Sequence, residues 1–252
     1  QECLRGDLRS LLEDRIGNFA VQALLQVCPG EQLFAVILEE LDPAAARSRL
    51  GVVFKILDWP LRRGAAFERA LRFFNDAFAL KLPSDKQAVV GQLVGSKIGL
   101  SILALFPRYS AEQNRHVVDA LLDMSAEAFV GLARDQTAAR FCEALLTGNV
   151  SAKARSRLIR KLLGHCADLA CDRAGSFVLE KAFQAAPLDL KQAIAGELAA
   201  ARKRLEDSMS GRIVLRKCRV EEFERQQADW VESEARSAKR KALLDDILEG
   251  AE

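Results

Sequence analysis

Apolar residues recur three and four positions apart along much of the chain, which is the spacing of amphipathic helices that bury one face. Three of these stripes can be aligned with one another, with apolar residues at matching positions. They predict helices whose apolar faces build a shared core. The stripes consist of Ala20, Val21, Leu24 and Leu25, of Val178, Leu179, Ala182 and Phe183, and of Ile213, Val214 and Cys218.

The starts of the predicted helices show a second regularity. In four segments an Asp precedes the apolar run, and a small residue follows that Asp three or four positions later. An Asp can cap a helix by accepting an amide hydrogen bond, which contributes about 1 kcal/mol. The aspartates are Asp14, Asp135, Asp172 and Asp207, and the small residues, with two looser matches at 51 and 95, are Gly17, Gly51, Gly95, Ala138, Gly175 and Gly211.

Successive small residues lie 34 to 44 positions apart, which is the period of stacked helical repeats. One repeat cannot bury its apolar face alone, so neighbouring repeats must share a continuous core. We therefore expect an all-α solenoid of about six repeats in residues 1–220, with an extra or lengthened helix at 64–82. The repeats' main helices are expected near residues 15–27, 50–58, 94–105, 136–147, 173–185 and 209–218.

Residues 221–252 form a highly charged segment of helical pattern. We expect this segment to cap the last repeat, because terminal repeats need a polar outer face, and its far end to project. The apolar anchors that it offers are Phe223, Trp230, Leu243, Leu244, Ile247 and Leu248.

The net charge of +2 says little about partners, but the charge is unevenly distributed. Residues 134–165 carry seven Lys or Arg and two acidic residues, and the run at 153–161 is the most basic part. Such a run is usually a solvated helix face. It gains a role in neutralising phosphates only if it flanks a nucleic-acid surface.

The sequence offers little chemistry for an enzyme. It has two histidines, six scattered cysteines without a CxxC pair, and neither a GxxxxGK[ST] nor a GxGxxG phosphate-binding motif. We expect no catalytic residues, no metal site and no cofactor. No uninterrupted apolar run approaches the roughly 18 residues of a membrane span, so no membrane partner is expected.

Two strings of the form D-x-x-G-[NS]-F-x-x-[QE], at residues 14–22 and 172–180, resemble Pumilio (PUF) repeats. The copies at 135–143 and 207–216 are more degenerate. The segment GRIVLRKCRVEEFERQQADW, which starts at Gly211, resembles the end of the divergent nucleolar protein nine group of PUF-like proteins. The resemblance implies a right-handed superhelical, curved array, of which this chain would be the C-terminal half.

The resemblance also implies a binding mode. In PUF proteins the second helix of each repeat lies on the concave face, where two side chains one turn apart touch a base edge and the residue between them stacks on bases. Residues i and i+4 share a helix face, so both can meet one base. The residues so implied are Asn18, Phe19 and Gln22, which resemble a uracil reader, and Ser176, Phe177 and Glu180, which resemble a guanine reader.

The other repeats depart from this pattern. Val52, Val53 and Ile56 offer no polar group at the corresponding positions of the second repeat. This predicts relaxed specificity, or readout of shape and backbone, rather than a linear code. The remaining candidate RNA contacts are Ser96 and Lys97, Arg140 and Glu143, and Arg212 and Arg216, of which the last two favour phosphate contacts.

The leading hypothesis is single-stranded RNA binding by a monomer. From the family resemblance we expect precursor ribosomal RNA in small-subunit maturation as the ligand, a nucleolar or nuclear location, and ribosome-assembly proteins as possible partners. A protein-binding scaffold of the HEAT or armadillo type and a cytoplasmic mRNA-binding PUF regulator remain alternatives. Matched polar residues on second helices favour RNA, because a scaffold has no reason to place them there.

Overall fold

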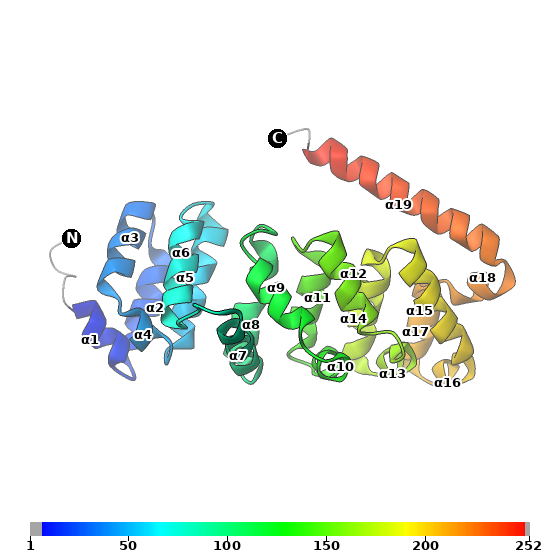
Figure 1. Ribbon diagram of the computed structural model, residues 1–252, viewed down its shortest axis with the longest axis horizontal. Helices are drawn as coiled ribbons and strands as arrows, with labels where there is room; N and C mark the ends of the chain where they lie inside the picture. Colours follow the sequence, from blue (N-terminus) through cyan, green and yellow to red (C-terminus); the bar gives the residue numbers. More distant parts are fainter. Residues whose placement is uncertain (1–6, 250–252) are drawn as a thin grey trace. The chain divides into compact units, whose positions relative to one another are not determined.

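The structure is a computed structural model that describes residues 7–249, without the side chains of residues 83, 238, 241, 242 and 244–249. Within residues 7–249 the regular structure is entirely helical, which confirms the all-α prediction (Figure 1). None of the described helices has the length and apolarity needed to cross a bilayer. The chain divides into two compact units, whose described parts are residues 7–124 with 148–150, and residues 125–147 with 151–249.

Unit 1 consists of helices in groups of three, in which the second helices α2, α5 and α8 contact one another in sequence order. The first group is α1 (Asp7–Glu13), α2 (Gly17–Val27) and α3 (Glu31–Glu40). The second is α4 (Pro43–Ala46), α5 (Leu50–Arg63) and α6 (Phe67–Ala77). The third is α7 (Pro83–Val94), α8 (Lys97–Leu103) and α9 (Arg115–Leu122), with the 3-10 helix η2 (Phe106–Arg108) between the last two.

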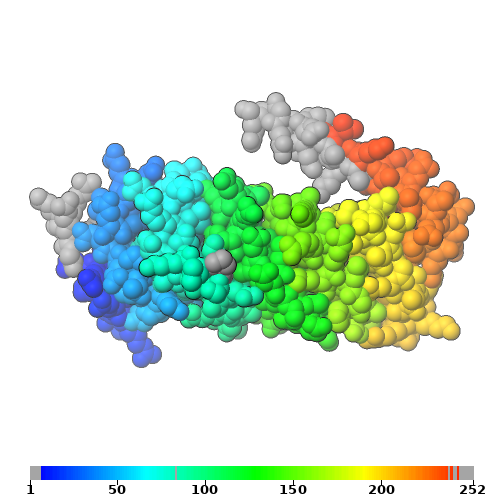
Figure 2. Space-filling model, in the orientation of Figure 1, coloured from blue at the N-terminus to red at the C-terminus, as the bar shows by residue number. Residues whose placement is uncertain are grey.

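Unit 2 repeats this construction. Its groups are α10 (Ala126–Arg134), α11 (Ala139–Thr147) and α12 (Ala152–Arg160), then α13 (Cys166–Cys171), α14 (Arg173–Ala185) and α15 (Leu188–Ala200), then α16 (Arg202–Glu206), α17 (Met209–Lys217) and α18 (Val220–Arg225). The second helices α11, α14 and α17 stand in a row, with the first helices α10, α13 and α16 along one edge (Figure 1). Figure 2 shows the three groups following one another in sequence order.

A close contact joins the first and second helices of a group. Gly175 of α14 lies so near Leu169 of α13 that an added Cβ would stand 3.0 Å from the Leu169 carbonyl oxygen. The same contact joins Gly17 to Leu11, Gly99 to Leu93 and Gly211 to Leu205. In each case the glycine follows the leucine by six residues, so these four glycines mark the same register.

The capping side chain lies midway between these two residues. Asp172 Oδ1 accepts hydrogen bonds from the amides of Ala174 and Gly175 at 2.9 and 2.7 Å. Asp14 caps the start of α2 in the same way, and Asp135 caps α11 through the amides of Thr137 and Ala138. These three predicted caps are therefore confirmed.

The register of two repeats differs from the prediction. Asp207 is not a cap, because it has helical backbone angles where α16 ends, and Ser208 instead accepts from the Gly211 amide at 3.3 Å. Gly95 is likewise not the small residue of the third repeat. Ser96 caps α8 by accepting from the Gly99 amide at 3.0 Å, so Gly99 takes that place.

The second repeat is also shifted by one position. Arg49 occupies the N-cap of α5, so Val52 is the equivalent of Gly99 and Gly175. Gly51 has a different contact: a Cβ there would stand 2.7 Å from Gln22 Oε1 of α2. The predicted extra helix at 64–82 is α6, which ends at Ala77 and is the third helix of this group.

The predicted stripes are mostly core. Val178, Leu179, Ala182 and Phe183 are all buried. Ala20 is a correction: it is exposed, because α2 turns only Val21 and Leu25 of its stripe fully inward.

The charged tail forms α19 (Gln227–Glu249), whose start packs on unit 2 (Figure 2). Trp230 is 1% exposed and lies against Phe183 and Phe223, with ring centroids 6.1 and 5.1 Å away. Glu234 is buried and pairs with Lys191 at 2.7 Å and with Arg219 at 3.4 Å. The start of the segment therefore packs against α18 of the last group and against α14 and α15 of the group before it.

Four apolar anchors were expected near the end of the tail, and the side chain of one of them is described. Leu243 is 63% exposed, so it is not an anchor in this chain. The side chains of Leu244, Ile247 and Leu248 lie outside the described residues.

Candidate nucleic-acid interface

The glycine contact places three side chains of each second helix at defined positions. We call the residues one, two and five places after the small residue, or after Val52 in α5, the first, second and third reading positions. They are Asn18, Phe19 and Gln22 in α2; Val53, Phe54 and Leu57 in α5; Leu100, Ser101 and Ala104 in α8; Ala139, Arg140 and Glu143 in α11; Ser176, Phe177 and Glu180 in α14; and Arg212, Ile213 and Arg216 in α17.

The first reading position of α2 is turned toward the protein. Asn18 is 6% exposed, and its Nδ2 donates to the carbonyl oxygens of Asp14 and Arg15 at 3.2 and 2.7 Å. Its Oδ1 accepts from Gln22 Nε2 at 3.0 Å. Asn18 thus holds Gln22, whose side chain passes over Gly51 of the next second helix.

Ser176 behaves in the same way in α14. It is 6% exposed, and its Oγ donates to the Arg173 carbonyl oxygen at 3.1 Å. Glu180 Oε2 lies 3.5 Å from Lys217 Nζ of α17. In both helices the side chain at the first reading position is hydrogen-bonded to the preceding turn. The side chain at the third reading position reaches toward the following second helix.

The second reading position carries exposed aromatic rings. Phe19 is 65% exposed and Phe177 is 57% exposed, although large apolar side chains in this protein are otherwise mostly buried. The corrected register adds Phe54 of α5, which is half-buried and has Lys55 Nζ 5.8 Å from its ring centroid. No signal in the sequence pointed to Phe54, because Arg49 makes no side-chain cap and Val52 is not a small residue.

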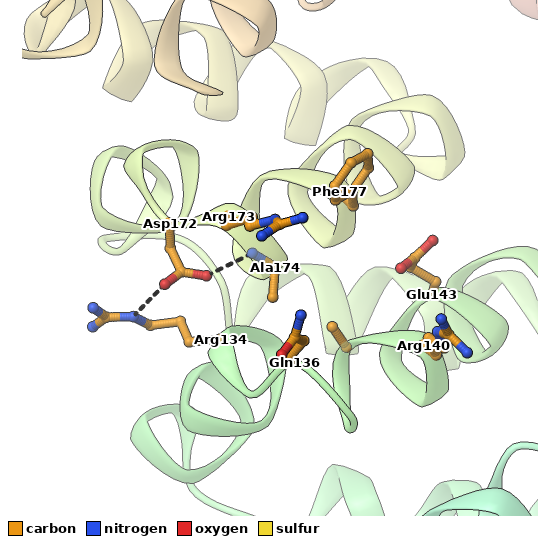
Figure 3. Close-up of a pocket in the computed structure, with 9 residues that line it drawn as sticks. Arg134, Gln136, Arg140, Glu143, Asp172, Arg173, Ala174 and Phe177 are labelled. Atoms are coloured by element: carbon orange, nitrogen blue, oxygen red, sulfur yellow. Dashed lines mark hydrogen bonds and ion pairs between the residues drawn. The ribbon is translucent and has the colours of Figure 1, made fainter. Parts of the chain in front are cut away.

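A groove of about 420 Å³ lies between α11 and α14 (Figure 3). Arg140, Glu143 and Phe177 line one part of it. At the other end Arg134 pairs with Asp172 at 3.9 Å, and Asp172 also caps α14. The groove thus offers a ring face, a guanidinium and a carboxylate from adjacent repeats.

The third repeat lacks such groups at its corrected positions. Leu100 is 7% exposed, and Ser101 Oγ donates to the Lys97 carbonyl oxygen at 3.0 Å. The alignment that made Ser96 and Lys97 reading positions is therefore wrong, because Ser96 is the cap and Lys97 is the first residue of α8. Lys97 is nevertheless exposed.

Arg212 and Arg216 are exposed on α17 and line a second groove, beside α18. The basic run at 153–161 lies elsewhere, since it forms α12, a third helix that packs on α11 and α15. Arg160 of this run pairs with Asp189 at 3.5 Å. The run therefore contributes none of the reading positions.

Four cysteines of the described chain, Cys28, Cys142, Cys166 and Cys218, are buried. No three His, Cys, Asp or Glu residues within the described part of the chain form a group that could hold a metal ion. Burial raises the pKa of the Cys142 and Cys218 thiols to about 12. His116 stands edge-on to Phe106, and burial lowers its pKa. Cys3 lies outside the described residues.

The sequence and the structure are similar to those of known proteins. A family model described as the NOP9-like PUF repeat domain matches residues 1–213. Pumilio homolog 23 of Arabidopsis thaliana is 26% identical over 90% of this chain and 33% of its own length. Nucleolar protein 9 of Mus musculus is 26% identical over 97% of this chain and 44% of its own length.

The fold is similar to that of solved PUF proteins. A structure of APUM23–GGAUUUGACGG superimposes with a TM-score of 0.82 at 25% identity, over 91% of this chain and 48% of that one. The chain therefore spans less than half the length of each of these relatives.

Proposed function

Because the chain belongs to the NOP9-like PUF repeat family, we propose that it binds single-stranded RNA along the reading positions of its second helices. The observation that carries this proposal is the matched placement of Phe19 and Phe177. Each is an exposed ring two places after a close-contact glycine, and each is followed three residues later by a polar side chain.

The physical reason is the cost and use of an exposed ring. A phenylalanine in water forgoes the roughly 1.5–3 kcal/mol that burial of such a side chain contributes. An unpaired base recovers it, because stacking on an aromatic side chain contributes about 1–3 kcal/mol per base. Beside the rings, the Gln22 amide can donate and accept, and the Glu180 carboxylate can accept from the N1 and N2 donors of guanine.

The irregular set of reading positions favours broad rather than base-by-base recognition. The second and third repeats present Val53 and Leu57, and Leu100 and Ala104, none of which can hydrogen-bond a base edge through its side chain. Arg140 and Glu143 can stack on a base and accept from it. Base contacts are thus concentrated in α2, α11 and α14.

The biological ligand that we propose is precursor ribosomal RNA during small-subunit maturation, in the nucleolus. Several relatives are named Nucleolar protein 9, which supports this location. The APUM23 structures pair a relative with uracil-containing 11-mers, which supports the single-stranded form. The chain would shield a single-stranded segment from premature processing, together with ribosome-assembly proteins.

The test is fluorescence anisotropy with the 11-mer GGAGUUGACGG, the sequence of one APUM23 structure, and with a shuffled 11-mer of equal composition. The variant Phe19→Ala/Phe177→Ala is compared with Val27→Ala/Leu82→Ala. The control removes two residues, 69% and 60% exposed, that lie outside the reading positions.

Loss of two stacking contacts should weaken RNA binding tenfold or more, since each is worth about 1–3 kcal/mol. The control should bind like the native chain. Equal binding by both variants would exclude the ring mechanism. Absence of binding by the native chain to either 11-mer at low salt would exclude RNA as its ligand and favour a protein-binding role.

A further inference from the structure

The groove between α17 and α18 has a volume of about 400 Å³, and its cations fall into two classes. Arg202 and Arg219 line it but are occupied by carboxylates. Arg202 pairs with Glu206 at 2.7 Å and with Glu224 at 2.5 Å, and Arg219 pairs with Glu222 and with Glu234.

Arg212 and Arg216 form the second class. They lie one turn apart on α17, both exposed, and neither forms an ion pair with any residue that the structure describes. The carboxylates that line the groove are already used: Glu206 by Arg202, Glu222 by Arg219, and Glu221 by Arg225 at 2.5 Å. The groove therefore presents two guanidinium groups without an ion-pair partner among the described residues.

The position of α17 at the end of the row of second helices bears on the role of Arg212 and Arg216. The side chain at the third reading position of a second helix reaches toward the next second helix, as Gln22 does toward Gly51 and Glu180 toward Lys217. In α17 that position is Arg216, and the helix beside it is α18 rather than another second helix. The stacking position is Ile213, which offers no aromatic face to a base.

We infer that the α17–α18 groove binds phosphate groups, and that in the RNA complex Arg212 and Arg216 hold the phosphodiester backbone where base contacts end. A guanidinium matches two phosphate oxygens with parallel N–H donors, and two such groups one turn apart can hold one phosphate or two neighbouring ones. The RNA part of this inference rests on the proposed function.

Base reading is the competing role for these arginines, since a guanidinium can also pair with guanine O6 and N7. The two roles differ in what they depend on. Phosphate contacts release counter-ions and give a salt-dependent affinity that is independent of sequence, whereas base contacts change sequence preference.

The experiment compares the native chain, Arg212→Gln/Arg216→Gln and the control Arg115→Gln/Arg236→Gln. The control removes the same charge from two exposed arginines that lie outside the groove and are already paired with Asp119 and Glu232. Affinity for GGAGUUGACGG is measured over a series of KCl concentrations. Base preference is measured by selection from random 11-mers, and circular dichroism checks that each variant is folded.

The inference predicts that the slope of log K against log salt falls in the Arg212/Arg216 variant, by about 0.7 if the pair holds one phosphate and by about 1.4 if it holds two, because each phosphate contact on a single strand contributes about 0.7. The selected base frequencies should stay the same, and the control should keep the native slope. A native slope in the Arg212/Arg216 variant, or a changed base preference, would overturn the inference and leave RNA binding itself intact.

A second measurement separates this site from RNA binding. Inorganic pyrophosphate is titrated into the native chain while the Nε–H resonances of Arg212 and Arg216 are followed by NMR. Shifts of these two resonances would support a phosphate site even if the native chain bound no RNA, in which case only the proposed function would fail. Unchanged resonances at saturating pyrophosphate would overturn the phosphate site.

Discussion

The side-chain oxygen of Asn18 accepts a hydrogen bond from the Gln22 amide at 3.0 Å, while the Asn18 amide donates to two carbonyl oxygens of the preceding turn. The two residues expected to touch one base edge therefore have different tasks in this structure. Asn18 is a buried support, and Gln22 is the group that reaches outward.

This division of tasks predicts different effects of truncation. Asn18→Ala should lower the free energy of unfolding by about 1–3 kcal/mol, because buried hydrogen-bonding groups lose their partner. Gln22→Ala should lower it by a smaller amount, about 0.5–1.5 kcal/mol, because it removes only the hydrogen bond to Asn18 Oδ1. Urea denaturation measures both. A Gln22 variant as destabilised as the Asn18 variant would contradict the assignment.

The ion pair between Lys217 and Glu180 predicts an effect on base preference. The lysine holds the carboxylate in place, so Lys217→Met and Glu180→Gln should both lower guanine enrichment at the same position of RNA selected from a random pool. Lys217→Arg keeps the charge and should retain the enrichment. If Lys217→Met left guanine enrichment unchanged while Glu180→Gln abolished it, Lys217 would have no positioning role.

The glycine contact predicts a large effect of one added methyl group. A Cβ on Gly99 would stand 2.1 Å from the Leu93 carbonyl oxygen, so Gly99→Ala should destabilise unit 1 by about 1–3 kcal/mol. Gly91 lies in α7 with nothing within 4 Å of its Cβ position. Gly91→Ala should therefore be neutral or stabilise by up to about 1 kcal/mol. Thermal unfolding of the two variants compares them directly, and similar melting temperatures would show that α7 and α8 separate easily.

The burial of the cysteine thiols predicts the order in which the cysteines react with iodoacetamide. The thiolate is the reactive form, and burial raises the pKa of Cys142 and Cys218 to about 12, so both should resist iodoacetamide at pH 8. Cys171 is partly exposed and should react first among the five described cysteines. Mass spectrometry of labelled peptides gives the order. Labelling in denaturant should remove the difference, and equal rates in the folded chain would argue that the buried sites open readily.

Much of the fold could be predicted from local patterns in the sequence. Asp172 and Gly175 carry a cap and a small residue at a fixed spacing, and both were placed correctly because each acts within its own helix start. Trp230 was recognisable as an anchor because it is a large apolar residue in a charged segment.

The register of the third repeat could not be predicted in the same way. Ser96 caps as Asp172 does, but a search for Asp passes over it, and Gly95 immediately before it is a small residue in a misleading place. The contact that distinguishes Gly99 from Gly95 is with Leu93, six residues earlier, and depends on how two helices cross.

The side chains of the candidate interface were only partly predictable. Their sequence positions could be read from the Asp14 and Asp172 strings, but the orientation of Asn18 and Ser176 could not. Short polar side chains can bond to the carbonyl oxygens of the preceding turn, and that local competition turns both residues inward.

The leucine–glycine contact confines the strict requirement for size to the base of the second helices that have it, α2, α8, α14 and α17. Exchanges two or five places further along, such as Phe for Arg or Gln for Glu, leave that contact untouched. A mutation can therefore alter what one repeat recognises without lowering the robustness of the scaffold. Such a design lets recognition diversify repeat by repeat during evolution while the architecture is inherited unchanged.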